Sequence, residues 1–196
     1  MPRIAAANIE AHIRNQEKRI LNAARDLFTS SGYRATDIAD IARSMGLARN
    51  SLYRYYSSKD HILVAVVQRE MAPFFEQLDE IEKEITDPIK RINAWIELQV
   101  EIAAGPCDAM MGMLGEIPPD AYELRKEISA LHEPPTRVLR VAVEEVIEGS
   151  GRDARLITAM ISSMVRSAAC IAMETELSDA HISELRHSVS SILSAK

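Results

Sequence analysis

The chain has 196 residues, 47% hydrophobic and 27% charged, with a formal net charge of −6. This length allows one domain or two small ones, and the composition is that of a folded globular protein, which excludes a largely disordered chain. The longest apolar run, residues 62–67, is too short to span a bilayer, and residues 1–10 lack the apolar core of an export signal. We therefore expect a cytoplasmic location and no membrane partner.

The charge is unevenly distributed along the chain. Residues 1–60 contain ten Lys and Arg against six Asp and Glu, a net of +4, whereas the remainder has a net of −10. This asymmetry favours a polyanionic partner for the amino-terminal part, although ordinary solvated faces would give the same pattern. The two cysteines, Cys107 and Cys170, lack the spacing of a metal or redox motif, as is usual in a reducing compartment.

Helical periodicity predicts four helices in the first part of the chain. The first spans residues 8–31, ends at Gly32, and has one buried stripe. The stripe consists of Ile13, Ile20, Ala24, Leu27 and Phe28. Thr36 can cap a short second helix that stops at Gly46, and a third covers residues 49–56. Ser-Ser-Lys-Asp at 57–60 is a helix-start signal, so a fourth helix runs from Lys59 to about residue 85, bent at Pro73.

Prolines and glycines divide the rest of the chain into further helices. The expected segments are 88–104, 107–114, 119–131, 135–147, 153–174 and 179–193. No stretch shows the alternation of a strand. The fold class is therefore all-α.

The second and third helices, joined by residues 44–47, fit a helix-turn-helix. If Leu52 points inward, a rotation of about 100° per residue puts Asn50 and Arg54 on the solvent face, flanked by Ser51 and Tyr53. Arg49 lies at the helix start, where side chains reach base edges; Arg can pair with guanine and Asn with adenine. Hydroxyl and ammonium groups suited to phosphates come from Thr36, Tyr53, Tyr55 and Lys59. The alternative is an ordinary polar helix face.

Residues 19–66 resemble the TetR family of transcriptional regulators. The resemblance rests on Ala24, Phe28, Gly32, Tyr33, Thr36, Ile41, Ala42, Gly46, Leu52, Tyr53 and Lys59. It implies a three-helix DNA-binding domain over residues 1–58, with a short amino-terminal arm, and a larger helical effector-binding and dimerisation domain over residues 59–196. Arg3 and Arg14 could let the arm enter a minor groove or touch phosphates; the alternative is a frayed chain terminus.

The resemblance also implies roles for individual residues. Thr36 and Lys59 would hold phosphates, and Tyr53 and Tyr55 would grip the backbone, with Arg54 near the groove. The residues that would face bases are Arg49, Asn50 and Ser51. Two positions depart from the family pattern: Asn50 stands where Gly is frequent, and Tyr56 stands where Phe is usual.

An effector pocket is the next implication of the resemblance. The residues expected to surround it are Phe74, Phe75, Trp95, Leu98, Ile102, Met110, Met111, Leu114 and Tyr122. Such aromatic and methionine side chains form adaptable apolar walls, but a plain hydrophobic core gives the same pattern.

The last two helices are expected to form a homodimer. Ile182, Leu185, Val189 and Ile192 repeat at three-and-four spacing in the last helix, as in a seam for a partner helix. Two recognition helices of a symmetric dimer could then read a near-palindrome. The alternative is that the stripes pack within one chain.

These observations favour a ligand-responsive regulator that binds double-stranded operator DNA. We expect a repressor released from a near-palindromic operator by an unknown small apolar or amphipathic effector. No catalytic, metal-binding or phosphate-loop motif is recognisable, so we expect no enzyme, metal or cofactor. Two alternatives remain: an effector-independent DNA-binding protein and an all-helical enzyme.

Overall fold

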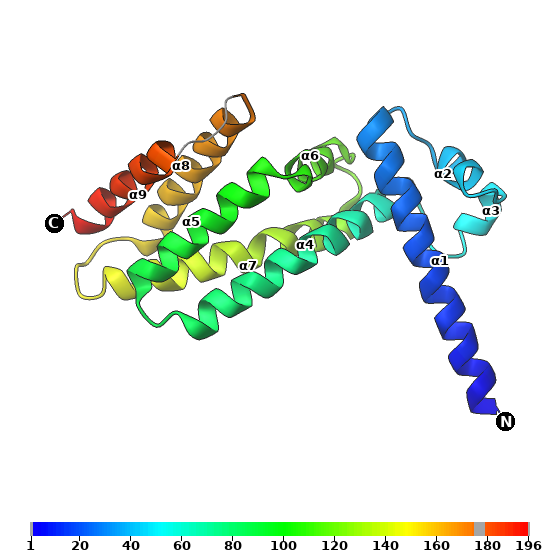
Figure 1. The fold of residues 1–196 in the computed structure, drawn as a ribbon, viewed down its shortest axis with the longest axis horizontal. Helices are drawn as coiled ribbons and strands as arrows, with labels where there is room; N and C mark the ends of the chain where they lie inside the picture. Colours follow the sequence, from blue (N-terminus) through cyan, green and yellow to red (C-terminus); the bar gives the residue numbers. More distant parts are fainter. Residues whose placement is uncertain (1, 175–178, 196) are drawn as a thin grey trace. The chain divides into compact units, whose positions relative to one another are not determined.

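The computed structural model describes residues 2–174 and 179–195, which form helices and no strand (Figure 1). The helices are α1 (Pro2–Ser31), α2 (Ile38–Ser44), α3 (Arg49–Leu52), α4 (Lys59–Glu84), α5 (Pro88–Ala104), α6 (Pro106–Met113), the 3-10 helix η1 (Leu114–Glu116), α7 (Tyr122–Val146), α8 (Ala154–Glu174) and α9 (Asp179–Ser194). The all-α prediction is confirmed. Among the helices described, none combines the length and apolarity needed to cross a bilayer.

The chain divides into two compact units. The amino-terminal unit consists of Met1–Glu70 and Ala109–Ile128, and the carboxy-terminal unit of Met71–Asp108 and Ser129–Lys196. Residues 59–70 of α4 therefore pack with α1, α2 and α3, beyond the boundary expected at residue 58. This grouping concerns packing alone, and the functional division at that boundary stays a prediction.

Helix α1 supplies the core of the amino-terminal unit. Ile20, Ala24 and Phe28 are fully buried, and α1 packs against α2, which packs against α3. The helix starts six residues earlier than expected, so the arm is helical from Pro2; the side chain of Arg3 lies outside the described part. Ile13 is 40% exposed, contrary to prediction, because it lies about two turns before the first buried residue of α1, Ile20, in the end that extends away from α2 and α3 (Figure 1).

Helix α2 is capped by Asp37 and not, as expected, by Thr36. The Asp37 carboxylate accepts from the Ile38 amide at 2.6 Å, and Asp40 Oδ2 accepts from the Asp37 amide at 2.9 Å, forming a capping box. A carboxylate one residue closer to the helix satisfies the free amides better than the Thr36 hydroxyl, which is turned inward. Helix α3 is also shorter than predicted, because its last turn is closed by bonds from the Tyr55 and Tyr56 amides to the Leu52 carbonyl.

In the carboxy-terminal unit, α5 packs against α8 and α9, and α8 against α9 (Figure 1). Leu185 and Val189 of α9 are buried in this core. They therefore pack within one chain, and the α9 stripe is not the exposed seam that was predicted. Helix α8 instead exposes Leu156, Met160 and Ile171.

Helix α7 is continuous through Pro134 and Pro135, where two helices were expected. Each proline removes a backbone donor and destabilises a helix interior by roughly 3 kcal/mol. Here buried side chains on both sides, Leu131 before and Leu139 after, keep the helix in one piece. The indole of Trp95 also donates to the Pro135 carbonyl at 2.8 Å, which fixes α7 to α5.

A buried arginine of α5, Arg91, links the α4–α5 turn to α7 in the carboxy-terminal unit. Arg91 is 7% exposed, and its guanidinium donates to the carbonyls of Ile85 at 3.0 Å and Thr86 at 3.3 Å and to Glu145 at 2.8 Å. These bonds join the α4–α5 turn to α7. A buried charge needs such partners, since an unpaired one would be costly.

Candidate DNA-binding surface

Helix α3 presents a polar face because one residue anchors it. Leu52 is fully buried, which directs Arg49, Asn50 and Arg54 to the solvent. Ser51 and Tyr55 are half-buried at the edges of this face, and Tyr53 is 43% exposed. The orientation expected from the rotation per residue is therefore the one observed. Base or phosphate contacts by these side chains stay predictions.

Arg49 and Tyr53 form a pair on this face. The Arg49 Nε and Nη2 atoms donate to the Tyr53 hydroxyl oxygen at 3.1 and 2.8 Å, and the guanidinium carbon lies 5.5 Å from the centre of the tyrosine ring. Hydrogen bonding to Tyr53 raises the pKa of Arg49 above its ordinary value. The cation is thus held in place on an otherwise exposed helix.

The start of α4 is fixed to the turn between α1 and α2 by Lys59 and Asp60. Lys59 Nζ donates to the carbonyls of Tyr33 and Thr36, both at 2.8 Å, and lies 4.2 Å from the centre of the Tyr33 ring. The Tyr33 hydroxyl donates to Asp60. Burial, followed by the hydrogen bond to Asp60, raises the pKa of Tyr33 well above its usual range. Two of the three ammonium protons of Lys59 therefore bond within the fold, and its contact with a phosphate stays a prediction.

Thr36 contributes to the same turn and not to the exposed face. It is 3% exposed, and its hydroxyl donates to the Gly32 carbonyl at 2.8 Å. The predicted phosphate contact needs an accessible hydroxyl, so this residue is better explained by its packing role. Tyr56, at the end of the α3 turn, is half-buried, and burial raises the pKa of its hydroxyl.

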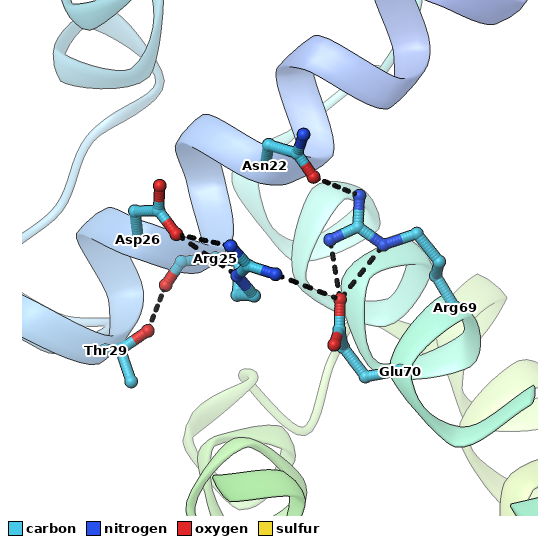
Figure 2. A network of polar contacts seen from close by, with 6 residues as sticks. All are labelled: Asn22, Arg25, Asp26, Thr29, Arg69 and Glu70. Atoms are coloured by element: carbon cyan, nitrogen blue, oxygen red, sulfur yellow. Dashed lines mark hydrogen bonds and ion pairs between the residues drawn. The ribbon is translucent and has the colours of Figure 1, made fainter. Parts of the chain in front are cut away.

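A polar network joins α1 to the part of α4 that belongs to the same unit (Figure 2). Arg69 donates to Asn22 at 2.9 Å and to Glu70 at 2.6 and 3.0 Å, and Arg25 lies 3.9 Å from the same Glu70 oxygen. Arg25 also bonds Asp26 at 2.9 Å. The network fixes the two helices relative to each other and adds to the apolar contacts of Ile20 and Phe28.

The predicted pocket residues fall into both units. Phe74, Phe75, Trp95, Leu98 and Ile102 belong to the carboxy-terminal unit, and Met110, Met111, Leu114 and Tyr122 to the amino-terminal unit. Trp95, Leu98, Met110 and Leu114 are buried, whereas Phe74, Phe75, Ile102 and Met111 are half-buried.

Tyr122 does not fit an enclosed pocket. It is 72% exposed, because it lies at the outer start of α7, where Arg125 stacks 5.0 Å from the ring centre. A hollow of about 440 Å³ lies beside Thr36, Asp40 and Arg43, and another of about 310 Å³ lies between α5 and α9. The predicted pocket residues line neither of them.

The sequence alone did not predict the side-chain contacts that hold α3 and the start of α4 in place. Tyr33 and Asp60 are 27 residues apart, so no local pattern could have paired them. The pair of Arg49 and Tyr53 was within reach, because residues four apart on a helix are neighbours. In the described part of the chain no three His, Cys, Asp or Glu residues gather in a way that could hold a metal ion.

A short helix that exposes arginine, asparagine and tyrosine from a rigid three-helix support can enter a major groove. This geometry defines the class of helix-turn-helix transcriptional regulators. Residues 20–66 match the family model of the bacterial regulatory proteins of the tetR family. The amino-terminal part of the chain is therefore a DNA-binding domain of the TetR family, and α2 and α3 form its helix-turn-helix.

Comparisons with individual proteins agree with this assignment. The chain is 25% identical over 147 residues to the fatty acid metabolism regulator protein of Bacillus subtilis, covering 73% of this chain and 76% of that protein. It is 32% identical over 80 residues to the repressor KstR of Mycobacterium tuberculosis, covering 41% of this chain and 36% of KstR. The crystal structure of FadR from Bacillus subtilis in complex with stearoyl-CoA has a TM-score of 0.70 at 21% identity, covering 90% of this chain and 97% of FadR.

Proposed function

We propose that this regulator is a homodimeric repressor that leaves its operator when an amphipathic effector binds. The observation that carries the DNA-binding part is the exposed polar face of α3, anchored by buried Leu52. Arg49 and Arg54 give this face positive charge, and they lie within residues 1–60, the segment with a net excess of cations. Phosphate neutralisation by such residues provides affinity, and contacts to base edges provide specificity.

A dimer is supported by helix α8. Its exposed side chains include Leu156 at 60%, Met160 at 44% and Ile171 at 54%. Large apolar residues grouped on one helix are unfavourable in water and mark an interaction surface. Pairing of α8 and α9 with the same helices of a second copy would cover them. It would also present two recognition helices to successive major grooves, about 34 Å apart.

The effector is proposed to be a long-chain acyl-CoA. Support comes from the relatives: the Bacillus subtilis protein is named a fatty acid metabolism regulator, and FadR was crystallised with stearoyl-CoA. The apolar side chains of Trp95, Leu98 and Ile102 are of the kind that binds an acyl chain, although two of the three are well packed here. The acyl chain would therefore need a conformation in which α5, which carries all three residues, separates from the helices packed against it.

DNA binding is tested by selecting bound fragments from the host genome and measuring affinity by fluorescence anisotropy. We expect a near-palindromic site bound tightly by the wild type and weakly by Arg49→Ala/Arg54→Ala. Arg140→Ala, which removes an exposed arginine of α7, is the matched control. A wild type with no preference among duplexes would refute the proposed function.

The effector is tested on the same operator complex with stearoyl-CoA, using free coenzyme A as the control. Coupling of about 1–3 kcal/mol between the two sites would weaken DNA binding roughly 5- to 150-fold, and DNA would weaken effector binding equally. Trp95, the one tryptophan of the chain, reports binding by its fluorescence. Operator binding that acyl-CoA leaves unchanged would favour the effector-independent alternative.

A further inference from the structure

We propose that Tyr53 is a positioning residue that holds Arg49 in the orientation needed to read a guanine in each operator half-site. The inference rests on the proposed function and deepens it, since it assigns one base and one side-chain pair. Tyr53 was expected to grip the DNA backbone. The contacts of α3 give it a second role that acts through Arg49.

The contact with Tyr53 occupies one edge of the Arg49 guanidinium, formed by Nε and Nη2, and leaves the opposite edge without a hydrogen bond to Tyr53. Arg49 directs Nε–H and one Nη2–H to the Tyr53 hydroxyl oxygen, at 3.1 and 2.8 Å. A guanidinium carries five N–H groups, so both Nη1–H groups and the second Nη2–H remain. One Nη1–H and the second Nη2–H point away from the stem of the side chain, parallel to each other, and form a fork of two donors.

A fork of two parallel donors matches the O6 and N7 acceptors of guanine in the major groove. The other bases do not present two acceptors in this arrangement. Asn50, next along the helix, carries an amide that suits adenine instead. The structure of α3 therefore favours a guanine at the position that Arg49 reaches.

Tyr53 can hold Arg49 because its own position is determined by the backbone. It follows the last residue of α3 with helical angles (φ −63°, ψ −12°), so it lies one turn beyond Arg49 on the same face. The ring also lies under the guanidinium, 5.5 Å from its carbon atom. A long side chain that is already oriented loses less conformational freedom on binding.

The hydroxyl of Tyr53 also links two kinds of DNA contact. Its oxygen accepts from Arg49, and its own O–H remains a donor. A phosphate that accepts this proton would polarise the hydroxyl, which strengthens the bonds from Arg49. Recognition of the base and of the backbone would then be coupled through one tyrosine.

The test is selection from a randomised duplex library, followed by affinity measurements on the selected site and on its guanine-substituted variants. We expect one enriched guanine per half-site in the wild type. Arg49→Ala and Arg49→Lys should each lower the preference for it about tenfold or more, because neither side chain has the fork. Tyr53→Phe keeps the ring and should lower the preference about three- to tenfold. Tyr56→Phe, which removes a half-buried hydroxyl at the end of the same turn, is the matched control and should leave the preference unchanged.

The decisive measurement is the double-mutant cycle. If Tyr53 acts through Arg49, then Tyr53→Phe has no further effect on guanine preference in the Arg49→Ala background. A loss of equal size in both backgrounds, or a Tyr53→Phe variant that weakens all duplexes alike, would overturn the inference. A wild-type operator whose guanines do not depend on Arg49 would overturn it while leaving the proposed function intact, whereas a wild type that enriches no sequence overturns both.

Discussion

Replacing Lys59 by methionine separates a structural role from a role in DNA binding. Methionine keeps most of the aliphatic stem of the side chain and removes its ammonium group. The structure gives that group two carbonyl acceptors, on Tyr33 and Thr36, at 2.8 Å each. The same ammonium group lies over the Tyr33 ring. Sequence reasoning alone assigned Lys59 to a phosphate.

The expected loss of stability follows from these contacts. A hydrogen bond to a charged group contributes about 1.5–3 kcal/mol to stability, and a cation over an aromatic ring about 0.5–1 kcal/mol at an exposed site. Because Lys59 is half-buried, the lower ends of these ranges apply. With two such hydrogen bonds and one ring contact, we expect Lys59→Met to lower the free energy of unfolding by about 3–4 kcal/mol.

Two measurements distinguish the roles. Urea unfolding followed by circular dichroism gives the stability, and anisotropy at several salt concentrations gives the salt dependence of operator binding. The one free proton of Lys59 allows a single phosphate contact, so the slope of log K against log salt should fall by at most about 0.9. Lys18→Met, which changes an exposed lysine of α1, is the control and should alter stability by less than about 0.5 kcal/mol.

An unchanged unfolding midpoint in Lys59→Met would refute the structural argument. An unchanged salt slope would remove Lys59 from the phosphate contacts. A loss of stability with an unchanged slope would mean that the ammonium group serves only the turn between α1 and α2.

Three further predictions concern pH and buried charge. The folded-state pKa of Tyr33 is raised above its ordinary value of 10, so its contribution to stability is fully present below pH 10 and is lost as the pH rises further. In the wild type the urea midpoint should therefore fall between about pH 9.5 and 11.5, roughly the titration range of tyrosine, and Tyr33→Phe should flatten this fall. An equally steep fall in the variant would contradict the argument. Arg91→Ala should destabilise the carboxy-terminal unit by about 1.5–3 kcal/mol, read from Trp95 fluorescence in urea, because it removes the hydrogen bonds by which this buried guanidinium joins the carbonyls of Ile85 and Thr86 to Glu145. Arg69→Ala removes a side chain of the network in Figure 2 that is 28% exposed, against 9% for the side chain of Arg91. It should lower the free energy of unfolding by no more than about 1 kcal/mol in urea unfolding followed by circular dichroism, and a loss as large as that of Arg91→Ala would contradict the burial argument.

The sequence by itself determined the helices with strong local signals. The start of α5 follows from Asp87, whose carboxylate accepts from the amides of Ile89 and Lys90 at 2.9 and 3.1 Å, and from Pro88 at the first helical position. The direction of α3 follows from Leu52, because one buried residue fixes the faces of a short helix. Both signals act over a few residues and need no partner from elsewhere in the chain.

Tertiary structure alone decided the features that depend on distant partners. Pro134 and Pro135 read locally as a break, yet buried neighbours on both sides keep α7 continuous. Likewise, the apolar period of α9 is the same whether Leu185 faces its own chain or another, and only the packing shows that it is buried within one chain. Periodicity reports which face of a helix is apolar, whereas the identity of the surface that covers it is set by contacts far apart in sequence.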